Sequence, residues 1–432
     1  MEHYVMKNSG VPWVDMIPET WSVRRGKTIL KLLNRPIRDD DEIITCFRDG
    51  EVTLRKNRRE DGFTIALQET GYQGIEPGDL VVHGMDGFAG SIGISDSRGK
   101  ATPVLNVMDS TQNKRYLMYY LRALAYKDVF MSLSTGIRVR SCDLRWNKLA
   151  VLPFLIPPIA EQNAIVSFLD DQVSQIDSLI QEAKASIEEY KQWKASTIFE
   201  AVTKGLSQDA EMKYSGIEWI GDIPKTSRLI RLRYLVQDYK AGPFGSSLIT
   251  DKLLHEGDIL VYTPEHVASK NTTSEKNLYL PKERAKEMEQ FFVHAGDIVF
   301  PIVGSLGRAM MITEEMPCGI INQRLAKFSL RENAVDPDYF MWVFGRSSFF
   351  TPYIEVNCRG SFIVNLTKTI VYDMPFVLPM EKAEQRRIAK YLDKKCGTID
   401  AMIAEKESVI LDLESFKRSL IYEIVTGKRK VV

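Results

Sequence analysis

Apolar side chains recur with heptad spacing along one stretch in the middle of the chain. From Leu169 onward, they are separated by alternating steps of four and three positions, and mostly polar residues stand between them. The stripe consists of Leu169, Val173, Ile176, Ile180, Ala183, Ile187 and Tyr190. This spacing aligns the side chains on one narrow face of an α-helix, which is typical of a helix that pairs with another helix. We therefore predict a long helix over residues 159–205 that forms half of a coiled coil.

A second stripe of the same kind occupies the end of the chain. Its members are Leu392, Cys396, Ile399, Ile403, Ile410, Leu413, Leu420 and Ile424, with Lys406 as an interruption. Prolines precede both stretches and glycines follow them, as expected at helix starts and stops. We predict a second long helix within residues 379–432. A helix of about 40 residues is roughly 60 Å long at 1.5 Å per residue.

The two helical stretches are copies of each other. At an offset of 223 residues, matched pairs include Glu161 and Glu384, Gln162 and Gln385, Asp170 and Asp393, Asp177 and Asp400, and Lys194 and Lys417. Because many matches are polar, shared hydrophobic periodicity alone does not explain them. A shorter echo relates residues 6–20 to residues 212–226 at an offset of 206. The chain is therefore a tandem duplication, and its two equivalent helices can pair antiparallel about a pseudo-two-fold axis.

The segments before each helix are dissimilar in sequence but share landmarks. "PGDLVVHG" and "AGDIVFPIVG" each predict a tight turn followed by a buried strand. Tyrosine- and phenylalanine-rich helices are expected at "RYLMYYLRALAY" and "DYFMWVFGRSSFF", and glycine turns leading to strands at "STGIRVRSCDL" and "CRGSFIVNL". The predicted fold class is α+β, with two mixed α/β domains separated by two long antiparallel helices. The expected divisions are 1–158, 159–205, 206–378 and 379–432.

Charge is balanced over the whole chain but not along it. The sequence has 57 basic and 57 acidic residues, which by itself argues against a nucleic-acid partner. Residues 21–158, however, contain 21 basic and 16 acidic residues, a net charge of +5. Residues 159–205 carry −4, and residues 227–378 contain 17 of each sign. A basic face is therefore possible on the first variable segment and is not indicated on the second.

Other features of the sequence indicate where in the cell the protein is expected. No run of about 18 apolar residues is present, so we expect no membrane span. The first residues do not resemble a secretory signal. The five cysteines are dispersed without metal-ligand spacing, which suits reduced thiols in the cytoplasm.

No catalytic constellation is apparent in the sequence. Gly26-Lys27-Thr28 lacks the upstream glycine of a phosphate-binding loop, and the five histidines form no metal-binding pair. Binding remains, through side chains that contact phosphates or base edges. The candidates are Arg55, Lys56, Arg58, Arg59, Arg138, Arg140 and Arg145 in the first segment, and Ser246, Ser247, Arg308, Gln323, Arg324, Arg359, Ser361 and Asn365 in the second. For any one of them, a solvated surface loop is an equally good interpretation.

The repeated "AEQ" helix starts, the "PFLIPP" and "PFVLP" lead-ins, "AGPFGSSL" and the paired "GD-[LI]-V" turns occur in a characteristic order. In this order the chain resembles the DNA-specificity subunit of type I restriction–modification enzymes. The resemblance implies two target-recognition domains that each read half of a split DNA sequence, with the two helices as a ruler between them. It also implies a non-catalytic chain without a cofactor. Two methyltransferase subunits that bind S-adenosylmethionine would dock on it and, through them, motor-nuclease subunits that use ATP and Mg²⁺. Base-reading residues vary within this family, so none is carried over.

Two other functions fit the same features. A cytoplasmic coiled-coil scaffold with two protein-binding heads would share the duplication and the helices, and it would lack salt-dependent affinity for DNA. A self-sufficient DNA enzyme would act as a purified chain with its cofactor alone.

Overall fold

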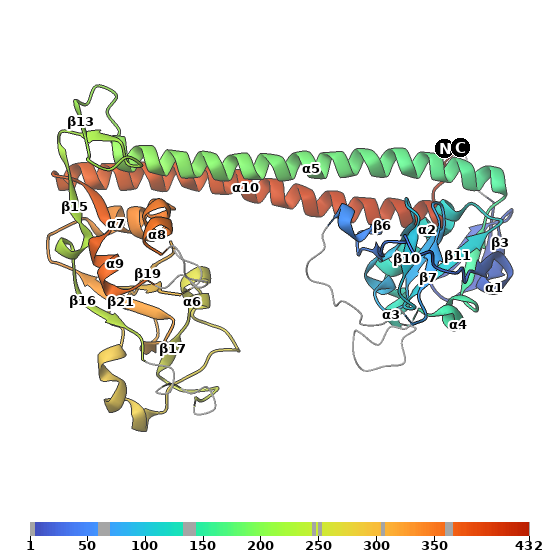
Figure 1. The fold of residues 1–432 in the computed structure, drawn as a ribbon, viewed down its shortest axis with the longest axis horizontal. Helices are drawn as coiled ribbons and strands as arrows, with labels where there is room; N and C mark the ends of the chain where they lie inside the picture. Colours follow the sequence, from blue (N-terminus) through green and yellow to red (C-terminus); the bar gives the residue numbers. More distant parts are fainter. Residues whose placement is uncertain are drawn as a thin grey trace. The chain divides into compact units, whose positions relative to one another are not determined.

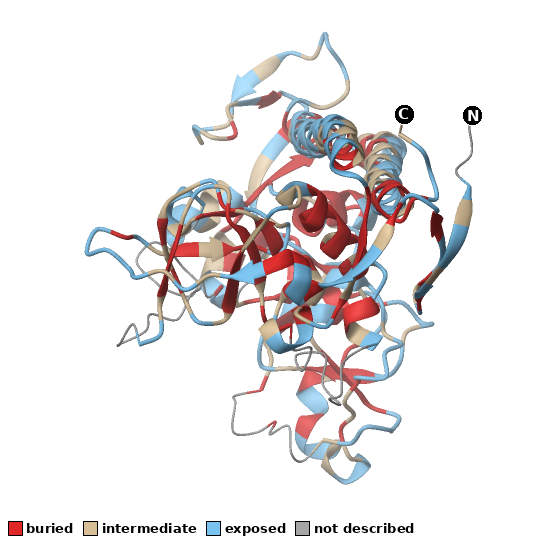
Figure 2. Ribbon diagram, turned by 90° about the vertical axis from the view of Figure 1, so that its right-hand side faces the viewer, coloured by how far each residue is buried: buried red, intermediate tan, exposed pale blue. Residues whose placement is uncertain are grey.

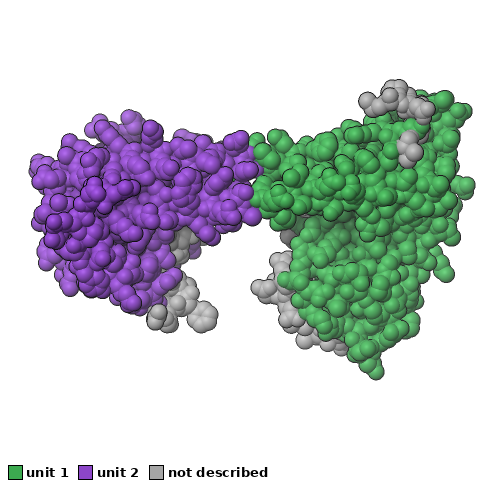
Figure 3. Space-filling model, turned by 90° about the horizontal axis from the view of Figure 1, so that it is seen from above, with its two compact units in different colours: residues 1–184, 407–432 green, residues 185–406 purple. Residues whose placement is uncertain are grey.

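The computed structural model describes residues 5–58, 70–132, 144–243, 248, 253–303, 307–358 and 366–431. The chain divides into two compact units (Figure 3): unit 1 comprises residues 1–184 and 407–432, and unit 2 comprises residues 185–406. Two long helices, α5 (Ile159–Lys204) and α10 (Lys382–Val425), run through both units. Each unit thus joins a globular α/β part to a portion of both helices. The sequence-based division into four segments stays a prediction.

Unit 1 is built on a four-stranded antiparallel sheet. Its strands, in spatial order, are β4 (Leu30–Leu32), β11 (Leu105–Ser110), β8 (Leu80–His83) and β9 (Ile92–Ile94). Helix α2 (Lys114–Tyr126) shares a hydrophobic core with this sheet, and its buried residues include Tyr116 and Tyr120. A separate antiparallel pair joins β3 (Ser22–Arg25) to β12 (Pro153–Ile156), and β12 directly precedes α5 in the chain.

Unit 2 repeats this architecture. Its sheet has the order β16 (Val236–Ala241), β21 (Leu325–Leu330), β18 (Asp297–Pro301) and β19 (Met310–Met311), again antiparallel throughout. Helix α7 (Pro337–Phe344) takes the place of α2, and β15 (Ser227–Arg231) pairs with β22 (Pro375–Pro379) before α10. Aromatic rings fill the core, with Phe340 stacked on Phe376 at 5.4 Å between ring centroids. The duplication therefore extends from sequence to strand order.

The predicted glycine turns are present before β8 and β18. Gly78 and Gly296 adopt φ values of +85° and +90°, a region that favours glycine because it has no Cβ. The aspartates that follow are buried and close their turns: Asp79 accepts from the backbone N–H of Glu76 at 2.8 Å. Asp297 accepts in the same way from the N–H of His294 at 3.0 Å. The two predicted strands are confirmed.

The units differ in the parts added to this shared sheet. Unit 1 adds the antiparallel pairs β5 (Ile44–Cys46) with β6 (Val52–Leu54), and β7 (Gln73–Ile75) with β10 (Gly99–Ala101). Unit 2 adds a parallel pair, β17 (Leu260–Tyr262) with β20 (Gly319–Ile321), and the short helix α6 (Pro264–Ser269). In each unit the added parts contribute to a second hydrophobic core. Sequence divergence between the copies thus corresponds to different additions on a common sheet.

In unit 1 the long helices run in opposite directions. The Tyr116 hydroxyl lies 2.8 Å from the carbonyl of Leu155, just before α5, and 3.3 Å from the carbonyl of Val425, at the end of α10. Farther along both helices, Lys417 donates to Asp177 at 2.5 Å. The start of α5 therefore lies beside the end of α10, as the pseudo-two-fold arrangement requires (Figure 1).

Unit 2 shows the same antiparallel pairing from the other ends of the helices. Ile198 and Val202, near the end of α5, share a core with Ile388 and Leu392, near the start of α10. Lys194 donates to Asp400 at 2.6 Å farther from these ends. The predicted antiparallel pairing is confirmed within each unit.

The predicted heptad stripes form the buried face of both helices. All of Leu169, Ile176, Ile180, Ala183 and Ile187 are buried, and Val173 and Tyr190 are half-buried. In the second stripe Leu392, Cys396 and Ile399 are buried, whereas Ile403, Ile410 and Leu413 are only half-buried on either side of Lys406. Figure 2 shows buried and exposed positions mixed around both long helices. Among the described residues, no helix is long and apolar enough to cross a bilayer.

Candidate nucleic-acid interface

The repeated glutamines attach each globular part to its long helix. Gln162 is buried; its Oε1 accepts from the backbone N–H of Asn113 at 3.0 Å, and its Nε2 donates to the carbonyl of Pro157 at 2.9 Å. In unit 2, Gln385 Oε1 accepts from the N–H of Asp336 at 2.7 Å. Asn113 and Asp336 are the N-caps of α2 and α7. These polar matches between the copies therefore orient the globular parts and do not face a ligand.

A second repeated contact lies eight residues farther along each long helix. The Tyr119 hydroxyl donates to Asp170 Oδ1 at 2.7 Å, and burial together with this carboxylate raises the pKa of Tyr119. At the equivalent positions of unit 2, Trp342 Nε1 donates to Asp393 Oδ1 at 3.0 Å, and Arg346 donates to the same oxygen at 3.1 Å. The attachment of α2 and α7 to the helices is thus the same in both units.

Three predicted residues of unit 1 lie together on and after the short helical turn η1 (Arg55–Asn57), which follows β6. Each is held by neighbours in unit 1. Arg58 pairs with Asp49 at 2.5 Å, and this hydrogen bond raises the pKa of Arg58. Its guanidinium also lies 4.4 Å from the centre of the Phe47 ring. Lys56 pairs with Glu42, and Arg55 Nε donates to Thr45 Oγ1 at 3.3 Å. The cluster exists, but acidic neighbours offset much of its charge.

Arg145 lies elsewhere on unit 1, at the start of the short helix α4 (Trp146–Leu149). It is exposed and lies beside Gly84, which follows β8. The neighbouring His83 accepts on Nδ1 from the N–H of Asp86 at 2.9 Å, and burial lowers the pKa of His83. A neutral histidine therefore shapes this loop, and Arg145 stands at its edge.

In unit 2, Gln323 lines a cavity of about 590 Å³ whose lining combines apolar and polar side chains. Its hydroxyl, amide and carboxylate groups come from Thr263, Glu265, Ser269, Asn271, Asn277 and Asn322. Hydroxyls and amides presented from a concave surface are groups that can hydrogen-bond to base edges. Arg324, the next residue, is exposed. Gln323 thus lies beside other hydrogen-bonding groups, and its role in reading bases stays a prediction.

A buried histidine organises this cavity. His266 Nδ1 accepts from the N–H of Thr263 at 2.9 Å, so the proton of the neutral ring belongs on Nε2, which lies 2.9 Å from Asn277 Oδ1. The hydrogen bond from Thr263 lowers the pKa of Glu265 and keeps that carboxylate ionised. Within the described ranges, no group of three or more His, Cys, Asp or Glu side chains is placed to hold a metal ion.

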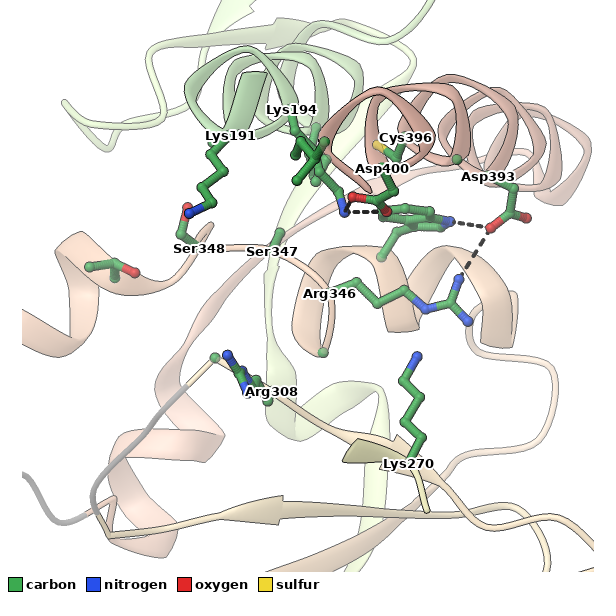
Figure 4. Close-up of a pocket in the computed structure, with 18 residues that line it drawn as sticks. Lys191, Lys194, Lys270, Arg308, Arg346, Ser347, Ser348, Asp393, Cys396 and Asp400 are labelled. Carbon is green, nitrogen blue, oxygen red and sulfur yellow. Dashed lines mark hydrogen bonds and ion pairs between the residues drawn. The ribbon is translucent and has the colours of Figure 1, made fainter. Parts of the chain in front are cut away.

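Arg308 lies in a different cavity of unit 2, of about 960 Å³, on the side that faces the long helices. Lys191, Lys194, Lys270 and Arg346 line the same cavity (Figure 4). The sequence analysis did not identify these four residues. They come from α5, the end of α6 and the end of α7, and no local motif links them.

The other predicted residues lie outside the described part of the chain: Arg59, Arg138, Arg140, Ser246, Ser247, Arg359, Ser361 and Asn365. The same holds for the glycine turns expected in "STGIRVRSCDL" and "CRGSFIVNL" and for most of the strands expected after them. These assignments stay predictions.

The fold of this chain is similar to that of a solved structure. A chain from a study of complex assembly and conformational transition of the type I R-M system superposes with a TM-score of 0.70, at 13% identity over 96% of this chain and 99% of that one. This chain therefore has the same fold as that one. Two HsdS-type structures align less closely. One is the HsdS subunit from Thermoanaerobacter tengcongensis (TM-score 0.49, 14% identity, 96% and 98% covered), and the other is the type I S subunit from M. genitalium (0.37, 14%, 94% and 96%). No protein-family model and no curated protein matches the sequence.

Proposed function

We propose that this chain is the non-catalytic DNA-specificity subunit of a type I restriction–modification complex. One observation carries the proposal: the same sheet, with the same attachment to the long helices, occurs twice, and different additions are built on it each time. Two reading surfaces on a common scaffold suit a target made of two different half-sites. The likeness in fold over nearly the whole chain supports the same assignment.

The mechanism that we propose is recognition of a bipartite target in double-stranded DNA. Each unit presents its own side chains to one half-site, and phosphate contacts set the register. Candidate readers in unit 1 are the residues of η1 and, at a separate place, Arg145. In unit 2 the candidate is the cavity of Gln323. Because α5 and α10 run through both units, their length governs the gap between the half-sites.

The methyltransferase subunits need a surface on this chain, and we propose that the long helices provide it. In unit 1, α5 exposes 50% of Leu179, and α10 exposes 67% of Leu411 and 51% of Phe416. Exposed apolar side chains of this size are candidate contacts for a protein partner. The S-adenosylmethionine used for methylation would be bound by these two partners, and ATP and Mg²⁺ by the motor-nuclease subunits that join them.

The test is to co-express the chain with the methyltransferase subunits and to sequence the methylated sites. We expect one split target sequence. Inserting four residues after Ala183 adds about 6 Å of helix and should change the gap while both half-sites stay the same. Changed half-sites with an unchanged gap would contradict the proposal. A complex without salt-dependent DNA affinity would instead favour the scaffold, and methylation by the chain alone would favour an enzyme.

A further inference from the structure

The cavity that contains Arg308 carries an excess of positive charge. It lies within unit 2, between α5, α10 and the segment that follows α7. Its charged lining consists of the five basic residues Lys191, Lys194, Lys270, Arg308 and Arg346 and the two acidic residues Asp393 and Asp400. Figure 4 shows Lys270 and Arg346 extending toward the same space, with Arg308 on the same side as Lys270.

Both carboxylates of this cavity are already engaged. Asp400 accepts from Lys194, and Asp393 accepts from Arg346 and the Trp342 indole. Lys270 and Arg308 have no acidic partner within the described ranges of the chain. Burial, followed by the like charges of Arg346 and Lys194, lowers the pKa of Lys270. The free protein thus holds mutually repelling cations together, and a bound anion would relieve that repulsion.

The backbone at Lys270 adds to this cost. Lys270 ends α6 with φ +55°, in the left-handed region that residues other than glycine rarely adopt. A lysine at such a position is strained relative to glycine, because its Cβ approaches the following carbonyl oxygen. The side chain is nonetheless exposed and directed into the cavity (Figure 4).

Comparison with unit 1 shows which charged residues of the cavity also attach the globular part to the long helices. The pairs Trp342–Asp393 and Tyr119–Asp170 occupy equivalent positions and make equivalent bonds. At the same offset of 223, however, Arg346 corresponds to Ala123, and Lys191 corresponds to Glu414. Unit 1 makes these attachments with basic residues of its own, since Arg115 pairs with Asp170 and Lys417 pairs with Asp177. In unit 2 the equivalent ion pairs use Arg346 and Lys194, and Lys270 and Arg308 take no part in them. These two cations are therefore not explained by the attachment of the globular part to the helices.

The size of the cavity favours an extended polyanion over a single small anion. Its volume of about 960 Å³ is roughly thirty times the ≈30 Å³ that one water occupies in the liquid. Serine and threonine hydroxyls at Ser347, Ser348 and Thr351 line it beside the cations. Lysine, arginine and hydroxyl side chains are the groups that contact the phosphates of a nucleic-acid backbone.

We propose that this cavity grips the phosphate backbone of double-stranded DNA independently of sequence, so that the two units hold DNA unequally. The proposal rests on the DNA-binding function proposed above and goes further, because it assigns Lys270 and Arg308 to backbone contact and not to base reading. Unit 2, whose variable segment has no net charge, then obtains its affinity for DNA from a locally concentrated set of cations.

The test is the double variant K270A/R308A in the full-length chain, with a mixed-sequence duplex as the probe. Both side chains are exposed, so the variant should fold. Each phosphate contact contributes about 0.9 to the slope of log K against log salt, so the slope should fall by about 1.8. Affinity should fall by the same factor for unrelated duplexes, and the methylated target sequence should not change.

The matched control is K225A/K282A, which removes the same charge from exposed ion pairs of unit 2 with Glu211 and Asp258. It should leave the slope unchanged. If the wild-type chain binds DNA and K270A/R308A retains its slope, the cavity assignment is wrong while the proposed function stands. If the wild-type chain shows no salt-dependent binding, the proposed function itself fails.

Two further outcomes would also overturn the assignment. A changed half-site sequence in K270A/R308A would show that these residues read bases. Thermal stabilisation of the wild-type chain by inorganic phosphate that is lost in the variant, with DNA binding intact, would show a site for a small anion.

Discussion

Lys194 on α5 donates to both carboxylate oxygens of Asp400 on α10, at 2.7 and 2.6 Å. Unit 1 contains the same ion pair with the helices exchanged: Lys417 on α10 donates to Asp177 on α5 at 2.5 Å. Each copy of the repeat thus supplies the lysine of one pair and the aspartate of the other. A two-fold relation between identical helices produces this exchange, because residue i contacts j and j contacts i. The pairs set the same helix register in both units.

Reversing the charge of Lys194 should weaken the helix pairing of unit 2. In K194E, two carboxylates face each other, and we expect a loss of about 0.5–1 kcal/mol, the range of partly exposed ion pairs. Adding D400K should restore the lost stability. Thermal unfolding at low salt measures both changes. The exposed Lys184 on the same helix is the control, and an equal loss in K184E would contradict a specific pairing.

The heptad stripe predicts that replacing two different leucines of α5 with alanine will lower the free energy of unfolding by very different amounts. Leu169 is 0% exposed and Leu179 is 50% exposed. L169A should cost about 2–4 kcal/mol because it leaves a cavity in the core of unit 1. L179A should change the free energy of unfolding by less than about 0.5 kcal/mol. Urea unfolding of both variants measures the difference, and similar midpoints would show that the stripe is not the buried face.

The two repeated glutamines should contribute equally to the free energy of unfolding. Replacing Gln162 or Gln385 with leucine leaves the backbone N–H of Asn113 or Asp336 without its acceptor. Each substitution should cost about 1–3 kcal/mol, the penalty for an unsatisfied buried donor. Q175L, at an exposed position of α5, serves as the control in urea unfolding. A large loss in only one copy would argue against equivalent attachments.

Acid should weaken unit 1 through Asp41. This carboxylate is 2% exposed and accepts two hydrogen bonds from Arg98, at 2.8 and 3.0 Å. The Arg98 hydrogen bonds are the main cause that holds the pKa of Asp41 below its usual 3.8. The pKa of Asp41 is lower in the folded state than in the unfolded state. The stability that ionised Asp41 contributes is therefore complete above pH 3.8 and is lost as the pH falls through the folded-state pKa.

The variant D41N tests this linkage. It should be about 1–3 kcal/mol less stable near neutral pH, because it replaces a charge-assisted interaction. The difference from wild type should shrink below about pH 4, where the wild-type carboxylate also loses its charge. Urea unfolding across this pH range measures the effect. A constant difference at every pH would show that ionisation of Asp41 does not contribute.

Most elements of the fold could be predicted because their signals are local. The stripe that begins at Leu169 depends on residues three or four positions apart, and a glycine before Asp79 or Asp297 specifies its own turn. By contrast, the paired acidic residues around Arg58 and the polar cavity of Gln323 depend on segments brought together by folding. Their sequence signals are single charged or amide residues that resemble any solvated loop.

The amino-acid sequence alone predicted the duplication, the two long helices and their antiparallel pairing, since a repeat and a periodicity can both be read along the chain without knowledge of its fold. The tertiary structure decided which charges meet. Lys270 and Arg346 are 76 positions apart and line one cavity only because α6 and α7 approach the same part of the helix pair. The net charge of residues 227–378 does not reveal this basic cavity. Electrostatic interactions depend on the distances between charges in space, and a sum of charges along the chain contains no such distances.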